Sequence, residues 1–336
     1  MTFRIGIVGA GFLTQRSLLP AIATADDLCL AAVLDTDPVA LGAVAARSPG
    51  TWCGADTRSF LRAPLDAVHI ATPNRRHAEF ACQALARGLP TLVEKPLADT
   101  VDAGQWIFRA ATASGAPAMV GYMSRYNAYN RAVVALLRSG ELGAVRSMTA
   151  THLGHRDGDW RNRRADSGLG CLADLAIYPL LTASDVFGSG PTACRATGYP
   201  SGDPDRTDIH VEATVWYGDE RQLQLEASFT EAPGVGVSRY TVICERGLVV
   251  VRDSWAMGPG GSVLVCDERG RRWLWPEPVD PYLAQYRALA ACVVGEPVPT
   301  EVSIARGLRD LRVLHALDRS VANGGVRLAL SGGHNT

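Results

Sequence analysis

The sequence shows none of the patterns of a membrane-spanning or disulfide-stabilised protein. Its cysteines, at positions 29, 53, 82, 171, 194, 244, 266 and 292, include no close pair, which argues against a zinc knuckle, a redox dithiol or a disulfide framework. Apolar runs such as residues 28–34 are far shorter than the ~20 residues needed to cross a bilayer. The opening Met-Thr-Phe-Arg-Ile-Gly-Ile-Val-Gly has no basic region before a long apolar core, so it is typical of a strand rather than a signal peptide. We therefore expect a cytoplasmic protein that does not span a membrane.

Charge of one sign is not in excess either. The 33 Lys and Arg residues nearly balance the 34 Asp and Glu residues, so no global charge points to a nucleic-acid or anionic-membrane partner. The composition, 47% hydrophobic and 20% charged, is that of a globular protein. At ~150 residues per domain, the length of 336 residues suggests two domains. Small-molecule partners remain open.

Short apolar runs alternate with segments of helical periodicity over the first 122 residues. Strands are expected at 3–8, 29–34, 67–70, 91–94 and 118–121, and helices at 12–23, 39–47, 77–87 and 101–114. Strands that alternate with helices form parallel sheets. The sequence therefore predicts a doubly wound parallel α/β domain, a Rossmann domain, over residues 1–122.

The pattern changes in the remainder of the chain. After a helix at 128–138, strands of alternating character are expected at 145–152, 210–216, 222–228, 240–244 and 247–252, with turn signals between them. Two helices, at 282–294 and 303–322, complete this part. Residues 123–336 are thus predicted to form a second α/β domain with a mainly antiparallel sheet.

A glycine-rich motif follows the first expected strand. Gly9 permits a tight turn, and Gly11 lets a pyrophosphate approach the backbone at the positive end of a helix. Thr14 stands where the dinucleotide fingerprint has Gly or Ala, which weakens the match, and a purely structural turn is the alternative. The neighbouring Phe12 and Leu13 join the glycines as candidate cofactor-binding residues.

An acidic residue ends the next strand. Asp35 stands at about the ~20-residue separation at which a carboxylate accepts hydrogen bonds from the adenosine ribose. Asp35 and Asp37 would repel a 2′-phosphate, and no Arg or Lys directly follows Asp35 to hold one. NAD is therefore favoured over NADP, although Arg47 can still reach the site.

Polar residues also follow the strands at 67–70 and 91–94, whose carboxyl ends are where open sheets bind ligands. Thr72-Pro73-Asn74 and His77 follow the first, and they are either cofactor contacts or a turn with a helix cap. Glu94 and Lys95 end the second. A lysine that terminates a buried strand is costly without a function or a partner, which makes Lys95 a candidate catalytic residue.

Together these residues resemble the glucose-fructose oxidoreductase and inositol dehydrogenase family, Gfo/Idh/MocA. The matching elements are Gly9-Ala10-Gly11, Thr72-Pro73-Asn74 with His77, Glu94-Lys95-Pro96, Gly121-Tyr122 with Arg125, and Asp174-Leu175-Ala176-Ile177-Tyr178-Pro179. The resemblance implies a catalytic Lys95, an often cis bond to Pro96, a second domain that binds the substrate, and a homodimer or homotetramer formed through the sheet of that domain. Arg125 becomes a candidate substrate-binding residue.

The motif in the second domain departs from the commonest family version. Inositol dehydrogenase-like members have Asp, three residues, then His, whereas this chain has Asp174 and Tyr178. Positions i and i+4 share one face of a helix, so both side chains are expected to serve one cleft. Tyrosine also occurs there in glucose-fructose oxidoreductase, dihydrodiol dehydrogenase and nucleotide-sugar 3-ketoreductases. A phenol can donate to a carbonyl oxygen or accept from an alcohol, which makes Tyr178 and Asp174 candidate catalytic residues.

The loop at 155–170 is rich in charge, with Arg156, Arg161, Arg163 and Arg164 among Asp157, Asp159 and Asp166. It is either a solvated loop or a grip for an anionic substrate, since guanidinium groups bind phosphate in a bidentate manner. Arg161 and Arg163 are the candidate residues of such a grip. His152 and His155 lack the further ligands of a metal site, so no metal is expected.

These features predict an NAD-dependent oxidoreductase that transfers a hydride between nicotinamide and a secondary carbinol or ketone carbon. The substrate would be a sugar, nucleotide sugar or cyclitol, with or without phosphate. Two alternatives remain open: an NAD-dependent glycoside hydrolase and a non-catalytic dinucleotide sensor. The direction of the reaction does not follow from residues that serve both directions.

Overall fold

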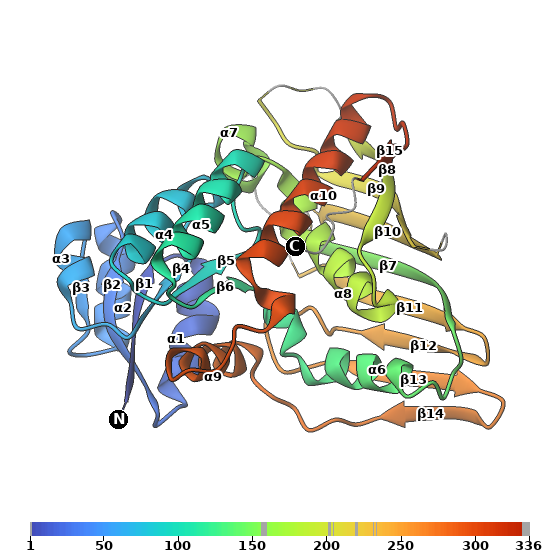
Figure 1. Ribbon diagram of the computed structural model, residues 1–336, viewed down its shortest axis with the longest axis horizontal. Coiled ribbons are helices and arrows are strands. Elements are labelled where there is room, and N and C mark those ends of the chain that lie inside the picture. Colours follow the sequence, from blue (N-terminus) through green and yellow to red (C-terminus); the bar gives the residue numbers. More distant parts are fainter. Residues whose placement is uncertain are drawn as a thin grey trace. The chain divides into compact units, whose positions relative to one another are not determined.

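The computed structural model describes residues 2–155, 160–200, 203, 205–218, 221–230, 232 and 234–330. By packing, the chain divides into two compact units. The first contains the chain up to Met123 and the later segment Tyr282–Leu308, and the second contains Ser124–Pro281 and the chain from Arg309 on. Figure 1 shows the elements of each unit.

The first unit contains a six-stranded parallel sheet in the order β3-β2-β1-β4-β5-β6. Its strands are β1 (Phe3–Val8), β2 (Leu28–Leu34), β3 (Trp52–Gly54), β4 (Ala67–Ile70), β5 (Thr91–Glu94) and β6 (Ala118–Gly121). This order reverses direction at β1 and β4, the point at which such sheets bind dinucleotides. The predicted Rossmann domain is confirmed, and the short strand β3 is an addition to the predicted set.

Helices connect these strands: α1 (Leu19–Ala23), α2 (Pro38–Arg47), α3 (Thr57–Arg62), α4 (His77–Ala86) and α5 (Val101–Ser114), with the shorter turns η1 (Thr14–Leu18) and η2 (Asn74–Arg76). The turn η3 (Met123–Arg125) follows β6, and the first unit ends at its first residue. Side-chain caps fix several of the helix starts. The carboxylates of Asp37 and Asp56 accept hydrogen bonds from the first turns of α2 and α3, and Thr100 does the same for α5. The predicted helix at 12–23 begins instead with the π-helical turn η1.

A late segment of the chain returns to the first unit. It comprises α9 (Pro281–Val293), η6 (Thr300–Val302) and the start of α10 (Ile304–Ala322). Arg287 of α9 donates to the Asp27 carboxylate at 3.2 Å, and a Cβ on Gly307 of α10 would lie 2.5 Å from Val120 of β6. Both late helices are expected in the second domain from the sequence, whereas α9 belongs to the first unit in the structure. The fully buried Tyr286 of α9 explains this, because its ring lies in the core of that unit.

The second unit is built on a nine-stranded sheet in the order β14-β13-β12-β11-β7-β10-β9-β8-β15. Its strands are β7 (Val145–His155), β8 (Pro191–Tyr199), β9 (His210–Tyr217), β10 (Arg221–Thr230), β11 (Val237–Cys244), β12 (Gly247–Arg252), β13 (Ser262–Asp267), β14 (Gly270–Leu274) and β15 (Leu328–Ala329). Among the described strands of this sheet, only β7 and β10 pair in parallel, so the predicted mainly antiparallel sheet is confirmed. Sequence reasoning did not identify β8, β13, β14 and β15.

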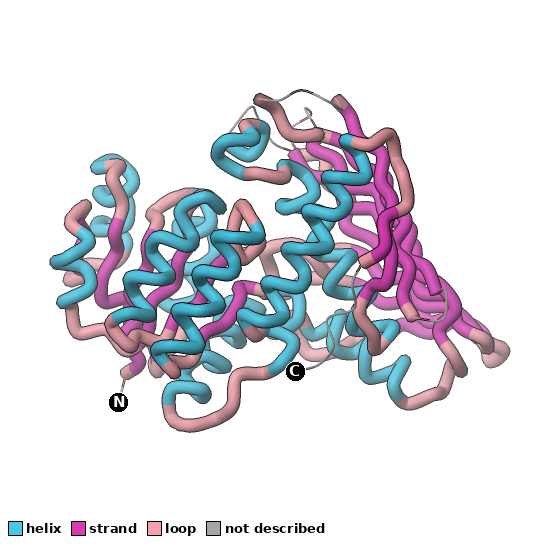
Figure 2. The backbone as a smooth tube through the Cα atoms, turned by 45° about the horizontal axis from the view of Figure 1, so that its top comes forward, coloured by secondary structure: helices cyan, strands magenta, loops and turns pink. Residues whose placement is uncertain are grey.

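Helices cover one face of this sheet (Figure 2). The second unit contains α6 (Ala128–Arg138), η4 (Trp160–Asn162), α7 (Arg164–Ser167), η5 (Leu172–Ala176) and α8 (Ile177–Phe187). The helical run 164–187 is long and apolar enough to pass a test for membrane spans, but 89% of its tested window is buried inside the fold. It is therefore a core helix.

The opposite face of the sheet carries no helix among the described residues in Figure 2. Strand pairing places Val250, Leu264 and Trp273 side by side across β12, β13 and β14 on that face, and Ile243 lies opposite Leu248 on the neighbouring pair. Ile243 and Trp273 are exposed. These five residues are the open-face patch.

Candidate active site

The glycine-rich turn lies between β1 and η1, as predicted. Gly9 has φ +108°, and a Cβ there would lie 2.5 Å from the carbonyl oxygen of Ala71, so this position requires glycine. A Cβ on Gly11, by contrast, would meet nothing within 4 Å. The backbone at Gly11 is therefore open to a ligand, which fits the approach of a cofactor pyrophosphate.

Thr14 accounts for the departure from the usual fingerprint. Its buried hydroxyl donates to the carbonyl oxygen of Gly9 at 2.6 Å and closes the turn from inside. Phe12 is 67% exposed and Leu13 is half-buried, so both stand at the outer side of the same turn. In this chain a side-chain hydrogen bond from Thr14 stabilises the turn. Other dinucleotide-binding folds have glycine or alanine at this third position.

Asp35 lies against this turn. One carboxylate oxygen accepts the backbone N–H of Ala10 at 2.6 Å, and the other accepts the N–H of Asp37 at 3.0 Å. The carboxylate is therefore oriented by two backbone donors at the carboxyl end of β2. Arg47 donates to the carbonyl oxygen of Gln15 at 2.6 Å, which engages one end of its guanidinium. A surface depression of about 570 Å³ beside the turn is lined by Phe12, Gln15, Arg16, Pro20 and Arg47.

The residues after β4 are brought to the same sheet edge. The hydroxyl of Thr72 is buried without a hydrogen-bond partner in the part of the chain that the structure describes, as expected of a group that a ligand satisfies. The side chain of Asn74 is buried, and Pro73 precedes it at the start of η2. An unpartnered buried hydroxyl at this edge is a second observation that fits a bound dinucleotide.

His77 lies fully inside the fold. Its Nδ1 is 3.0 Å from the carbonyl oxygen of Pro96, and its Nε2 is 2.9 Å from that of Thr72. Burial lowers the pKa of the ring, and the carbonyl contacts oppose that shift. The imidazole therefore connects the loop after β4 to the loop after β5. Because the ring is fully buried, it supports the backbone of these loops and is not exposed at the surface of the site.

Lys95 follows β5 directly. Its side chain belongs to a half-buried residue, and its backbone N–H donates to Oε2 of the buried Glu94 at 3.2 Å. The bond to Pro96 is cis, as the family resemblance implied. Lys95 is also the single lysine of the chain, so 32 of its 33 basic residues are arginine. The one side-chain amine of a chain whose other basic residues are arginine thus stands at the carboxyl end of a parallel strand, and this count is a signal in the sequence that was missed.

Two further residues of this site were also missed. His69 of β4 is fully buried, with Nε2 3.2 Å from Oε1 of Glu94 and Nδ1 2.8 Å from the hydroxyl oxygen of Tyr286 in α9. The available signal for His69 was a polar residue within a strand that is otherwise apolar. Tyr286 gave no signal, because it stands 217 residues further along the chain.

The second unit holds Asp174 and Tyr178. Asp174 lies in η5, a π-helical turn, and Tyr178 lies in the first turn of α8, which continues from it. The sequence predicted a single helical segment, and the structure begins it with this wider turn. Such turns occur often at functional sites. Asp174 is half-buried and Tyr178 is 8% exposed.

Aromatic residues fix the ring of Tyr178. The imidazole of His152 in β7 meets it edge-on, with 5.2 Å between ring centroids, and Nδ1 of His152 lies 3.1 Å from the carbonyl oxygen of Leu175. Trp255 also packs against His152, with 5.3 Å between ring centroids, and donates its indole N–H to Thr182 of α8 at 3.1 Å. The phenol of Tyr178 is therefore held in one orientation by packing against β7.

The arginines of the loop before η5 face carboxylates. Nε of Arg161 lies 3.4 Å from Asp174, Arg163 donates to Asp166 at 2.5 Å, and Arg164 lies 3.2 Å from Asp318. Positions 156–159, with Arg156, Asp157 and Asp159, lie outside the described residues. The described arginines thus have partners in the fold, and Arg161 is the one tied to a predicted catalytic residue.

Arg125 is also paired within the second unit. It donates to Asp185 of α8 at 2.7 Å, and its side chain is only 6% exposed. Such a buried pair anchors the start of the second unit to α8.

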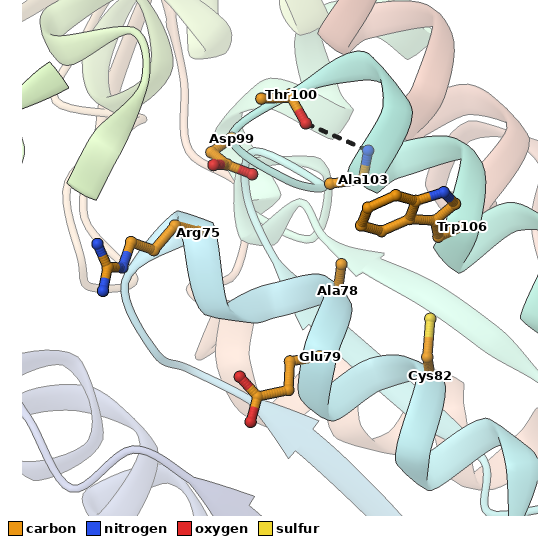
Figure 3. Close-up of a pocket in the computed structure, with 8 residues that line it drawn as sticks. All are labelled: Arg75, Ala78, Glu79, Cys82, Asp99, Thr100, Ala103 and Trp106. Atoms are coloured by element: carbon orange, nitrogen blue, oxygen red, sulfur yellow. Dashed lines mark hydrogen bonds between the residues drawn. The ribbon is translucent and has the colours of Figure 1, made fainter. Parts of the chain in front are cut away.

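A separate depression of about 480 Å³ lies over α4 and α5 on the first unit (Figure 3). Its lining residues are Arg75, Ala78, Glu79, Cys82, Asp99, Thr100, Ala103 and Trp106. None of the predicted site residues lines it, and the hydroxyl of Thr100 there caps α5 by accepting the N–H of Ala103. This depression is not part of the candidate active site.

Comparison with known proteins agrees with this geometry. Residues 3–122 match the GFO_IDH_MocA oxidoreductase family, described by its NAD-binding Rossmann fold, and residues 130–250 match the GFO/IDH/MocA C-terminal domain. The crystal structure of aldose-aldose oxidoreductase from Caulobacter crescentus, complexed with glycerol, superposes with a TM-score of 0.89 at 26% identity. That likeness covers 98% of this chain and all of the other.

Two curated relatives show the range of known activities. An inositol 2-dehydrogenase of Ralstonia nicotianae is 33% identical over 241 residues, which cover 67% of this chain and 72% of the relative. A dTDP-3,4-didehydro-2,6-dideoxy-alpha-D-glucose 3-reductase of Streptomyces antibioticus is 31% identical over 187 residues, 55% of this chain and 57% of the relative. The fingerprint, the Glu-Lys-Pro turn and both matched domains place this chain in the GFO/IDH/MocA family of NAD(P)-dependent oxidoreductases.

Proposed function

We propose that this protein is an NAD-dependent dehydrogenase or ketoreductase that acts on a secondary carbinol or ketone carbon of a sugar, nucleotide sugar or cyclitol. One observation carries the proposal. Lys95 follows the carboxyl end of β5, at the sheet edge that also holds the open backbone of Gly11 and the Asp35 carboxylate. Parallel strands bind their ligands at this edge, so a primary amine there is in place to act on a substrate beside a bound dinucleotide.

The substrate class is supported by the relatives. They include a cyclitol dehydrogenase and a reductase of a dTDP-linked sugar, and both names describe chemistry at a ring carbon that carries oxygen. Tyr178 stands at the position usually held by histidine, as the tyrosine does in family members that act on sugars and nucleotide sugars. The proposal therefore favours a ring-shaped polyhydroxylated substrate.

Each residue has a proposed task in this reaction. The nicotinamide, when bound, supplies or accepts the hydride. Lys95 stabilises alkoxide character on the reacting oxygen, Tyr178 relays its proton, and Asp174 orients Tyr178 or holds a neighbouring hydroxyl. The cofactor would be held by Gly9, Gly11, Phe12, Leu13, Asp35, Thr72, Pro73, Asn74, Glu94 and Lys95, with His77 shaping the nicotinamide end. Arg125, Arg161 and Arg163 are the proposed substrate-binding residues, of which Arg161 adjoins Asp174 most directly.

A panel of sugars, cyclitols and nucleotide sugars, assayed by NADH absorbance, tests the proposal. We expect turnover with at least one of them in the presence of NAD or NADH. Hydrolysis of a glycoside with no net NADH release, by protein that retains its cofactor, would instead indicate the NAD-dependent glycoside hydrolase. Cofactor binding with no turnover of any kind would indicate the dinucleotide sensor.

Asp35 is proposed to set the preference for NAD. In the variant that combines Asp35→Ser with Thr36→Arg, the carboxylate that repels a 2′-phosphate is gone and a guanidinium partner is added. We expect the ratio of kcat/KM for NADP to that for NAD to rise at least ~10-fold, the equivalent of one charge-assisted bond. Thr36→Arg alone is the matched control. Tighter binding of NADP than of NAD by the unmodified protein would overturn the assignment.

The open-face patch is the proposed oligomer contact. Its apolar side chains lie on the sheet face that no described helix covers, and large apolar patches of this kind mark association sites. A homodimer or homotetramer would bury them. Light scattering measures the mass directly, and the mass of a single chain would contradict this proposal.

A further inference from the structure

A series of buried hydrogen bonds, here called the buried polar chain, leads to the backbone of Lys95 at the end of β5. The proposed reaction assigns no task to His69 and Tyr286 in this series. It runs from the hydroxyl of Tyr286 to Nδ1 of His69 at 2.8 Å, and from Nε2 of His69 to Oε1 of Glu94 at 3.2 Å. Oε2 of Glu94 then accepts the backbone N–H of Lys95 at 3.2 Å. His69 and Tyr286 are fully buried and Glu94 is 7% exposed, so the chain lies in the interior of the first unit.

With Glu94 as a carboxylate and His69 as a neutral imidazole, the donors and acceptors of this buried polar chain have one consistent order. A carboxylate only accepts, so Nε2 of His69 must carry the proton and donate to Glu94. A neutral imidazole then accepts at Nδ1, and the hydroxyl of Tyr286 donates to it. Each bond points toward Glu94, and hydrogen bonds in such a series polarise one another in a medium of low dielectric constant.

The surroundings hold the Glu94 carboxyl in a single place. A Cβ on Gly121 of the neighbouring strand β6 would lie 2.8 Å from Oε1 of Glu94, so only glycine leaves room for that oxygen. The rings of His69 and Tyr286 also pack edge-on, with an angle of 78° between their planes and 5.5 Å between their centroids. Packing and hydrogen bonds thus hold both oxygens of Glu94, and the second oxygen accepts the backbone N–H of the residue that bears the amine.

We propose that Tyr286 and His69 are positioning residues that act through Glu94 to fix Lys95 for catalysis. Groups that orient the ligands of metal sites change affinity or activity by 10–100-fold when removed, and we expect the lower end of that scale here. The inference rests on the proposed function only in assigning catalysis to Lys95. It explains why α9, from far along the chain, packs a tyrosine into the first unit.

The histidine can be divided into its two bonds by substitution. In His69→Gln the amide N–H reaches the position of Nε2 and keeps the bond to Glu94. In His69→Asn the shorter side chain keeps a partner for Tyr286 and loses Glu94. We expect His69→Asn to lower kcat about 10-fold with little change in cofactor affinity. Tyr286→Phe should do the same, because it removes the hydroxyl that keeps the imidazole proton on Nε2 by donating to Nδ1. In His69→Gln the amide N–H donates to Glu94 without that hydroxyl, so we expect most of the activity to be retained.

The single lysine supplies a readout that needs no activity. In protein labelled with ¹⁵N only in lysine, one backbone amide resonance reports the Lys95 N–H that Glu94 accepts. We expect that resonance to shift in His69→Asn and in Tyr286→Phe, and to stay near its original position in His69→Gln. Tyr217→Phe is the matched control, because it removes a buried hydroxyl of the second unit whose bond to Leu180 is long, at 3.4 Å.

Melting temperatures identify variants that are only destabilised. Equal loss of kcat in His69→Gln and His69→Asn, or an amide resonance that does not move in His69→Asn and Tyr286→Phe, would overturn the inference. These outcomes differ from failure of the proposed function. In that case Lys95→Met retains full turnover, whatever the Lys95 amide resonance does in the His69 and Tyr286 variants.

Discussion

Replacing Lys95 by Met is expected to lower turnover by ~100-fold or more while binding of NAD remains nearly intact. This is the scale for loss of one positioned electrostatic or acid–base group. Met keeps the length and apolar stem of the side chain and removes the amine. Since the chain has no other lysine, no neighbouring amine can replace it. Steady-state kinetics and cofactor titration by fluorescence measure the two quantities separately.

Lys95→Arg is the informative companion variant. It keeps a positive charge at the end of β5, but a guanidinium does not release its proton and its planar shape differs from that of an ammonium. We expect it to remain well below the unmodified protein if Lys95 exchanges a proton, and to approach it if charge alone is required. Unchanged turnover in Lys95→Met would remove the lysine from the mechanism and favour the dinucleotide sensor.

Tyr178→Phe is expected to lower kcat by ~100-fold or more with little change in NAD affinity. The ring retains its edge-on contact with His152, so the free energy of unfolding should hardly change, and only the hydroxyl is lost. An interaction made mainly in the transition state appears in kcat rather than in ground-state binding. The pH profile of kcat should also lose the limb that the phenol contributes.

Tyr217→Phe serves as the control for this change as well. It removes another buried hydroxyl of the second unit, and we expect kcat to stay within about twofold of the unmodified value, as for a weak hydrogen bond. A raised KM in Tyr178→Phe, with the limb of the pH profile intact, would assign Tyr178 to substrate binding. The proton relay would then pass to Lys95 or to a bound water.

The sequence by itself determined five of the six strands of the Rossmann sheet and the residues at their carboxyl ends. The strands at 3–8, 67–70, 91–94 and 118–121 have the predicted bounds, because buried parallel strands are short apolar runs between turn residues. Gly9 and Asp35 were identifiable because a turn of positive φ and a carboxylate at a strand end leave local signals. Tertiary packing then placed the Asp35 carboxylate against the glycine-rich turn.

The tertiary structure alone decided how distant residues complete the site. Helical periodicity gave α9 but not the unit on which it packs, since an apolar face does not specify its partner. The arginine loop looked like a possible anion grip, and only the fold pairs Arg161 with Asp174 and Arg164 with Asp318, 154 residues away. The bond between His69 and Tyr286 spans 217 residues. Such pairs are fixed by the burial of polar groups that must find hydrogen-bond partners, and that requirement acts through space rather than along the chain.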